Sequence, residues 1–195
     1  MKHSSTRELF DYWNRRRGTR PAPERGEIEP GAIRRVLADT FILTIDPPSG
    51  HPFRIAGTRV CAAFGRELKG VAFTDLWADA SKPAVRDLLA VVAAESVGVV
   101  AGASGLSCAG APLKLELLAL PLVHRGGLNG RILGALVPSE VPYWLGVSTL
   151  GHLTLGTFRH LGPQTDPTLA PRMLSDGSPD GRLRRGLVVY DGGHI

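Results

Sequence analysis

The chain has too little cysteine for a disulfide-stabilised secreted protein. Its 195 residues include two cysteines, Cys61 and Cys108, and one pair cannot form the disulfide framework of a small secreted domain. We interpret both as small buried hydrophobic residues in a reducing compartment.

Long apolar segments are also missing. The N-terminal stretch MKHSSTRELF lacks the apolar core of a signal peptide. The most apolar late stretch, residues 141–161, is interrupted by His152, Arg159 and His160, so it does not have the pattern of a membrane span. We therefore expect no membrane association and a cytoplasmic location.

Motifs of catalysis and metal binding are absent as well. The stretch GASGLSCAG contains neither a G-x-S-x-G nucleophile motif nor a following GK pair. Asp75 and Asp79 flank Trp77 and could act as an acid–base pair, but helix capping explains them more simply. His152 and His160 are too far apart on a strand to share one metal ion. We predict no catalytic residue, no metal site and no enzymatic activity.

Positive charge is concentrated near the beginning of the chain. The net charge is +5, and Arg15–Arg20 is followed by Arg25, Arg34 and Arg35. Such a cluster suits phosphate contacts, but it equally suits the solvated C-terminal end of a helix. Because no aromatic residues are interleaved with it, binding of nucleic acid or a nucleotide is the less favoured alternative.

The first 57 residues predict a helical cap followed by a β-hairpin. Ser5 and Glu8 form an S-x-x-E capping box, and Gly18 can end the helix. Residues 40–46 and 52–57 are β-rich stretches separated by the turn PPSG. In the second stretch, apolar residues alternate with Arg54, which places Phe53 and Ile55 on one face.

A helical crossover and three further strands follow. Val85, Leu88, Leu89 and Val92 form an amphipathic stripe, and strands are expected in residues 97–103, 112–123 and 131–137, with a tight turn at Asn129-Gly130. The strand at 112–123 is apolar on one face throughout and on both faces after Glu116. The sheet therefore needs cover on both sides, from the crossover helices and from the N-terminal helix or a second copy's helix.

The organisation predicted from these patterns has five parts. Residues 1–38 form the N-terminal helical cap, and residues 39–145 form the core. Residues 146–161 are an extension that we interpret as a strand, and residues 162–183, rich in Pro, Gly, Asp and Ser, form a flexible loop. Residues 184–195 hold a short strand and a tail, and this strand is a candidate partner for the extension.

Three stretches carry a resemblance to a known family. LFDYWNRRRGTRPAPERGEIEP, FRIAGTRVCAAFGRELKGVAFTDLW and RILGALVP together resemble the PAS-domain family, and in particular a PAS-like family of alphaproteobacterial proteins. The resemblance covers residues 7–144. It implies an α+β, PAS-like fold: a five-stranded antiparallel sheet, a helical crossover on one face and an N-terminal helix, here with a C-terminal extension.

The resemblance also allows the cofactors of such domains to be considered. Light-sensing flavin domains have a reactive cysteine in a motif such as G-R-N-C-R, but here GRELKG places Glu67 and Leu68 at those positions. The connecting helix, residues 81–96, has no histidine for b-type haem. Both cofactors are therefore disfavoured, and the cofactor stays unknown.

The function implied is a non-enzymatic sensory or regulatory module that binds a small apolar ligand, a separate signalling protein, or both. Gly57, Gly65 and Gly70 would bend a wall around the ligand. The pocket candidates are Phe53, Ile55, Phe64, Leu76, Leu88, Leu115, Leu117 and Leu136. Phe10 and Trp13 are the candidates for a homodimer interface. The alternative is a ligand-free adaptor whose core is filled by its own side chains.

Overall fold

A computed structural model describes residues 1–124, 127–161, 182–184 and 187–189. Four helical segments precede the first strand: α1 (Ser4–Arg17) and the short 3-10 helices η1 (Arg25–Glu27), η2 (Pro30–Ile33) and η3 (Leu37–Asp39). Then come β1 (Thr40–Thr44), β2 (Phe53–Ala56), α2 (Thr58–Ala63), η4 (Phe73–Leu76) and α3 (Lys82–Glu95). The remaining elements are β3 (Gly98–Ser107), β4 (Pro112–His124), β5 (Gly127–Pro138), β6 (Leu150–Leu161), β7 (Arg182–Arg184) and β8 (Leu187–Val189).

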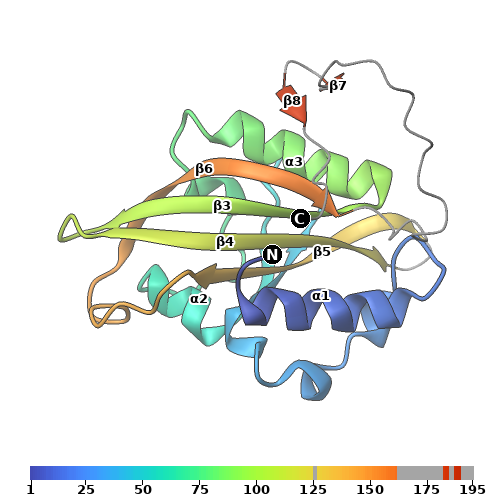
Figure 1. Cartoon of the computed structure of the whole chain (residues 1–195), viewed down its shortest axis with the longest axis horizontal. Helices are drawn as coiled ribbons and strands as arrows, with labels where there is room; N and C mark the ends of the chain where they lie inside the picture. Colours follow the sequence, from blue (N-terminus) through green and yellow to red (C-terminus); the bar gives the residue numbers. More distant parts are fainter. Residues whose placement is uncertain (125–126, 162–181, 185–186, 190–195) are drawn as a thin grey trace, which may run out of the picture.

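The main sheet is antiparallel and has the strand order β2-β1-β5-β4-β3-β6 (Figure 1). The five predicted strands are all present, and the α+β, PAS-like fold is confirmed. The sheet has six strands and not five, because β6 pairs with β3 along its length, from Gly98 opposite Leu161 to Ser107 opposite Leu150. The predicted extension strand is thus an edge strand of the same sheet.

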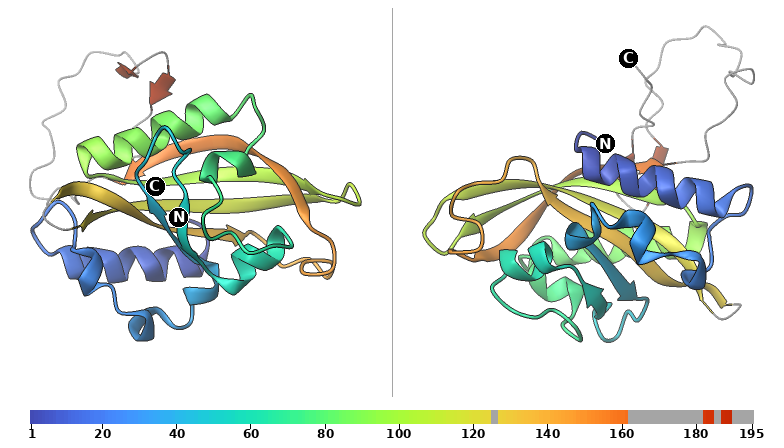
Figure 2. Two further views of the ribbon diagram at one scale, coloured as in Figure 1. Left: turned by 180° about the vertical axis from the view of Figure 1, so that it is seen from behind. Right: turned by 90° about the horizontal axis from the view of Figure 1, so that it is seen from below.

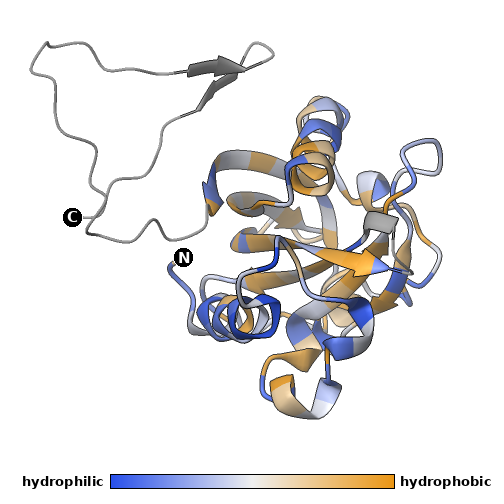
Figure 3. Cartoon of the chain, turned by 90° about the vertical axis from the view of Figure 1, so that its right-hand side faces the viewer, coloured by the Kyte–Doolittle hydropathy of each residue, from blue (hydrophilic) through white to orange (hydrophobic). Residues whose placement is uncertain are grey.

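Helices cover both faces of this sheet (Figure 2). On the inner face, α2, η4 and α3 enclose one hydrophobic cluster, and on the outer face α1 and the first 3-10 helices enclose another. Strand β4 separates the two, because Leu115 and Leu117 belong to the inner cluster whereas Leu118 and Leu120 belong to the outer one. Hydrophobic residues accordingly line the sheet in Figure 3, while the helices carry hydrophilic residues on their far sides.

The chain's own α1 covers the outer face. Tyr12 and Trp13 are buried against the sheet, and the Trp13 indole Nε1–H donates a hydrogen bond of 2.8 Å to the carbonyl oxygen of Pro121 in β4. The helix begins earlier than the capping box suggested, since His3 is the N-cap and its Nδ1 accepts from the Ser5 N–H. Gly18 ends it with a positive φ of 57°, as expected.

Two details of the strand connections differ from expectation. Asn129-Gly130 lies inside β5 and is not the turn, because His124 already pairs with Gly127. The short strand near the end, β8, pairs with β7 and not with β6. Residues 162–181, in which we expected a flexible loop, and residues 190–195 lie outside the described part of the chain.

A β-bulge in β2 changes the direction of one predicted pocket residue. Leu43 pairs with Phe53, and the next residue, Ile42, pairs with Ile55, so Arg54 is an extra residue in the ladder. A bulge of this kind interrupts the two-residue alternation of side chains. Phe53 therefore joins Leu43 in the inner cluster, whereas Ile55 is 51% exposed, opposite Ile42 of the outer cluster. The assignment of Ile55 to the inner pocket was wrong.

Candidate functional site

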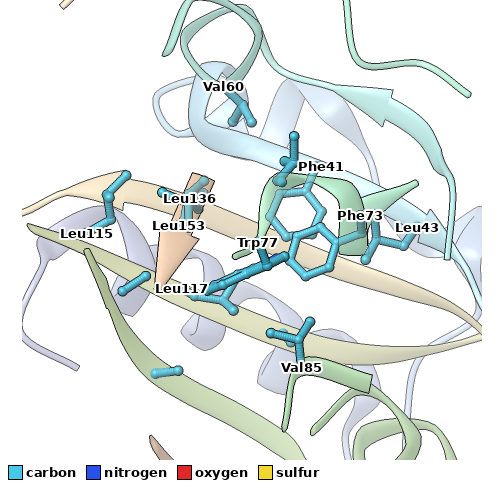
Figure 4. Packing of buried hydrophobic residues seen from close by; sticks show 14 of the residues in the cluster. Phe41, Leu43, Val60, Phe73, Trp77, Val85, Leu115, Leu117, Leu136 and Leu153 are labelled. Carbon is cyan, nitrogen blue, oxygen red and sulfur yellow. The ribbon is translucent and has the colours of Figure 1, made fainter. Parts of the chain in front are cut away.

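The inner face of the sheet carries a cluster of aromatic rings. Phe41 lies 5.5 Å from both Phe53 and Phe73 between ring centroids, and Phe73 lies 5.7 Å from Trp77. The rings come from β1, β2 and the segment containing η4, which the glycine-punctuated crossover brings against the sheet. Figure 4 shows Phe41, Phe73 and Trp77 together with Leu117 of β4 and Leu153 of β6. We call this region the inner core.

Most of the predicted pocket residues meet in the inner core. Six of them belong to its cluster, and none of the six is more than 4% exposed: Phe53, Leu76, Leu88, Leu115, Leu117 and Leu136. Phe64 is half-buried and packs against the same cluster. Seven of the eight candidates thus lie in or against the inner core, and Ile55 does not.

Trp77 gives the inner core a polar group that the sequence did not reveal. Its side chain is fully buried, and its indole Nε1–H has no hydrogen-bond partner among the residues that the structure describes. An unpaired buried donor typically costs about 1–3 kcal/mol, so such groups need a structural or functional explanation. The sequence around Trp77 does not reveal this, because no sequence signal tells a paired indole from an unpaired one.

The segment containing Trp77 is joined to the edge strand β6. Trp77 forms an isolated bridge with Leu153, and the Ala78 N–H donates to the Leu153 carbonyl at 2.8 Å. Two residues further along β6, the Leu155 N–H donates to Ser81 Oγ at 3.1 Å. A displacement of Trp77 would therefore act directly on β6 and on the start of α3.

On the outer face, Glu116 of β4 holds the beginning of α1. Its carboxylate accepts hydrogen bonds from the Lys2 N–H at 2.7 Å, from the His3 N–H at 3.2 Å and from the Thr6 hydroxyl. Burial disfavours the ionised form, but the bonds from Thr6, Lys2 and His3 outweigh it, so the pKa of Glu116 lies below its usual range. Neighbouring Leu117 faces the inner core, so adjacent residues of β4 contact the two layers.

His51 is a second buried polar residue near the inner core. It is 1% exposed and has a positive φ of 60°. Its Nδ1 accepts from the Asp46 N–H at 3.3 Å, and its carbonyl accepts from the Phe73 N–H at 3.2 Å. Burial lowers its pKa, and Arg86 lowers it further against the opposing effect of Asp46. The backbone carbonyl of His51 thus links the β1–β2 connection to η4, while the imidazole bonds within that connection.

A comparison with known protein families agrees with this arrangement. The family model of the PAS domain matches residues 1–137. The chain belongs to the PAS-domain family. No curated protein and no solved structure matches it. PAS domains are in general sensory or regulatory modules, and the match includes α1 as well as β1–β5, whereas β6 lies beyond its end.

The titratable side chains of this PAS domain are dispersed within the described residues. No group of three or more His, Cys, Asp or Glu side chains there could hold a metal ion. Asp79 forms an exposed ion pair with Lys82 at 2.8 Å, and the hydrogen bond from Lys82 lowers the pKa of Asp79. Burial raises the pKa of the Cys61 thiol, which disfavours the reactive thiolate.

The N-terminal aromatic and basic residues mostly contact their own chain. Trp13 is 3% exposed in the outer cluster, and half-buried Phe10 stacks on it at 6.0 Å between ring centroids. Arg16 pairs with Glu29 at 2.8 Å, and Arg20 pairs with Glu27 at 2.9 Å. Of the two predicted interface residues, Phe10 is therefore the one with surface left for a partner.

Across the described residues, no helix combines the length and the apolar character needed to span a membrane.

Proposed function

We propose that this PAS domain is a non-enzymatic, cytoplasmic sensory or regulatory module of bacterial signal transduction that binds a small apolar ligand in the inner core. The observation that carries the proposal is the unpaired indole N–H of Trp77 within an otherwise apolar cluster. Ligand pockets typically combine apolar walls with few polar groups that fix orientation. A ligand with one hydrogen-bond acceptor would pair with this N–H.

Ligand binding would act by shifting a conformational equilibrium. The acceptor would favour one position of Trp77, and the contacts of Ala78 and Ser81 with β6 would move the edge of the sheet with it. A shift of β4 at Leu117 would reach α1 through Glu116. A separate signalling protein, or a second copy meeting α1 around Phe10, would detect these changes.

The test follows the mass of the protein and the indole signals of its tryptophans. Protein purified from a bacterial host is examined by native mass spectrometry and by NMR of the indole N–H groups, before and after extraction of small molecules under denaturing conditions and refolding. We expect a bound mass that extraction removes. The Trp77 N–H signal should then move upfield, because its hydrogen bond is lost.

Trp13 is the internal control, since its indole N–H is bonded to Pro121 and should keep its signal. Trp77→Phe assigns the Trp77 signal. A bare chain mass together with an unchanged Trp77 signal contradicts ligand binding.

That contradictory outcome would favour the second candidate, a ligand-free interaction adaptor. The observation in its favour is the burial of the inner core, where the six candidates belong to one hydrophobic cluster and are at most 4% exposed. Arginine-dependent nucleic-acid binding has less support, because Arg16 and Arg20 are already paired within the chain. A lack of binding to nucleic acid at low ionic strength would exclude it.

A further inference from the structure

A hollow lies on the outer face of the sheet, between the 3-10 helices and strands β1 and β2. Its volume is about 480 Å³, within the range of about 300–1,000 Å³ that is usual for small-molecule pockets. The 3-10 helices form the loop below α1 in Figure 1, and α1 itself packs on β4 and β5. We call this hollow the outer groove.

The outer groove is apolar because of the bulge in β2. Ile42 and Leu133 form its floor from β1 and β5, and Ile33 forms part of its wall. The extra residue Arg54 turns Ile55 to the same side, where it is 51% exposed, and Leu37 is 39% exposed opposite it. Apolar side chains left open in a concave site are typical of ligand binding.

Two arginines add positive charge to this apolar hollow. Arg25 and Arg34 both line it, and neither has an ion-pair partner among the described residues. This distinguishes them from nearby Arg16 and Arg20, which are paired with glutamates. No acidic side chain is among the residues that line the groove. The charges of Arg25 and Arg34 are therefore available to an anion.

We propose that the outer groove binds a free small molecule with an apolar chain or ring system and one carboxylate. The apolar part would cover Ile55 and Leu37, and the carboxylate would meet the guanidinium groups of Arg25 and Arg34, whose planar donors match its geometry. This site differs from the inner core, since Trp77 does not line it, although Phe41 belongs to the lining of both. The experiments below therefore test this proposal independently of the proposed function.

Decanoate and 1-decanol are suitable probes, because they share the chain length and differ in the charged head group. Binding to the full chain is measured by calorimetry and by NMR chemical-shift changes at low ionic strength. We expect decanoate to bind at least about tenfold more tightly than decanol, the effect of one charge-assisted hydrogen bond. Shift changes should appear at Leu37 and Ile55, and the Trp77 indole signal should not move.

Three variants locate the site. Arg25→Gln combined with Arg34→Gln should weaken decanoate at least about tenfold and leave decanol unchanged. Ile55→Glu should reduce binding of both probes, because it introduces a charge into the apolar part of the groove. Arg35→Gln is the matched control, since Arg35 is exposed on the same segment but does not line the groove, and it should bind like the wild type.

Three outcomes would overturn the proposal. The first is no decanoate binding by the wild type. The second is equal binding of both probes that the paired arginine substitution does not affect. The third is arginine-dependent binding to phosphatidylglycerol vesicles without binding to monomeric decanoate, which would identify the groove as a contact for a lipid surface.

Discussion

At the scale of single residues, Trp77, His51 and Glu116 are the buried or half-buried polar groups most closely connected with the two layers of this fold. Trp77 has an unpaired donor, His51 is kept neutral by burial, and Glu116 is ionised and accepts three hydrogen bonds. The imidazole and the carboxylate each predict a distinct dependence of stability on pH.

Acidification should destabilise the fold through His51. Its folded-state pKa is lowered, so above the ordinary value of about 6.5 both states hold a neutral imidazole, and below it the unfolded state binds the proton first. The free energy of unfolding should therefore fall as the pH drops from about 7.5 to about 5.5, by at most about 1.4 kcal/mol per pH unit for one proton. Denaturant unfolding at a series of pH values measures this slope.

His51→Asn should remove that part of the slope, because asparagine does not titrate here and tolerates the positive φ. His152→Asn serves as the control, since His152 is exposed on β6. Equal slopes for the wild type and His51→Asn would rule out a contribution of His51.

Glu116→Gln should loosen the start of α1. The substitution keeps the size of the side chain but removes the charge that the N–H groups of Lys2 and His3 and the hydroxyl of Thr6 bind. We expect a loss of about 1–3 kcal/mol, with faster amide hydrogen exchange in the first turn of α1. Because the pKa of Glu116 is lowered, its contribution should be lost in the wild type as the pH falls below about 4.3.

Lys114→Gln changes an exposed residue of the same strand and the same face, and it should leave exchange in α1 unchanged. If amide hydrogen exchange in the first turn of α1 is unchanged in Glu116→Gln as well, the prediction is contradicted, and the apolar contacts of α1 are sufficient to hold it.

At the scale of elements, the bulge in β2 determines which side chains lie on each face of the β1–β2 hairpin. Arg54 has no partner position in β1, so Phe53 and Ile55 face opposite layers although they are two residues apart. One strand thereby contributes a ring to the inner core and an apolar side chain to the outer groove.

Deletion of Arg54 should be tolerated. The shortened strand would keep Phe53 opposite Leu43 and Ile55 opposite Ile42, so every side chain would keep its face. We expect a loss below about 3 kcal/mol, typical of a single change, and retained decanoate binding. Deletion of Ile42 in the regular partner strand should cost more, because it turns neighbouring inward residues outward. Thermal unfolding followed by circular dichroism compares the two; equal losses would contradict the role of the bulge.

At the scale of the whole molecule, the order of the first five strands along the chain and the two covered faces could be predicted from the sequence. Alternation in residues 112–123 separated Leu117 from Leu118, and the i, i+3, i+4, i+7 stripe of the crossover helix is buried as expected, at Val85, Leu88, Leu89 and Val92. These features are local periodicities, which is why reading the chain in short windows found them.

The features that could not be predicted depend on partners distant in the sequence. Nothing in PFRIAG shows that Arg54 is left out of the ladder, because that depends on the register with β1. Likewise, the unpaired N–H of Trp77 and the placement of Arg25 and Arg34 in the lining of the outer groove depend on residues that surround them in space. The apolar residues of the inner core could be proposed from the sequence. The unpaired indole N–H within it and the outer groove could not.

The double-sided β4 has a consequence for how the molecule holds together. Its leucines form part of two hydrophobic compartments at once, with Leu117 in one and Leu118 in the other. Both compartments depend on the same strand at this point. If β4 loses its place in the sheet, both lose packing contacts, so neither should unfold while the other stays folded. The helical cap and the inner core should therefore unfold as one cooperative unit, because both pack on the same strand.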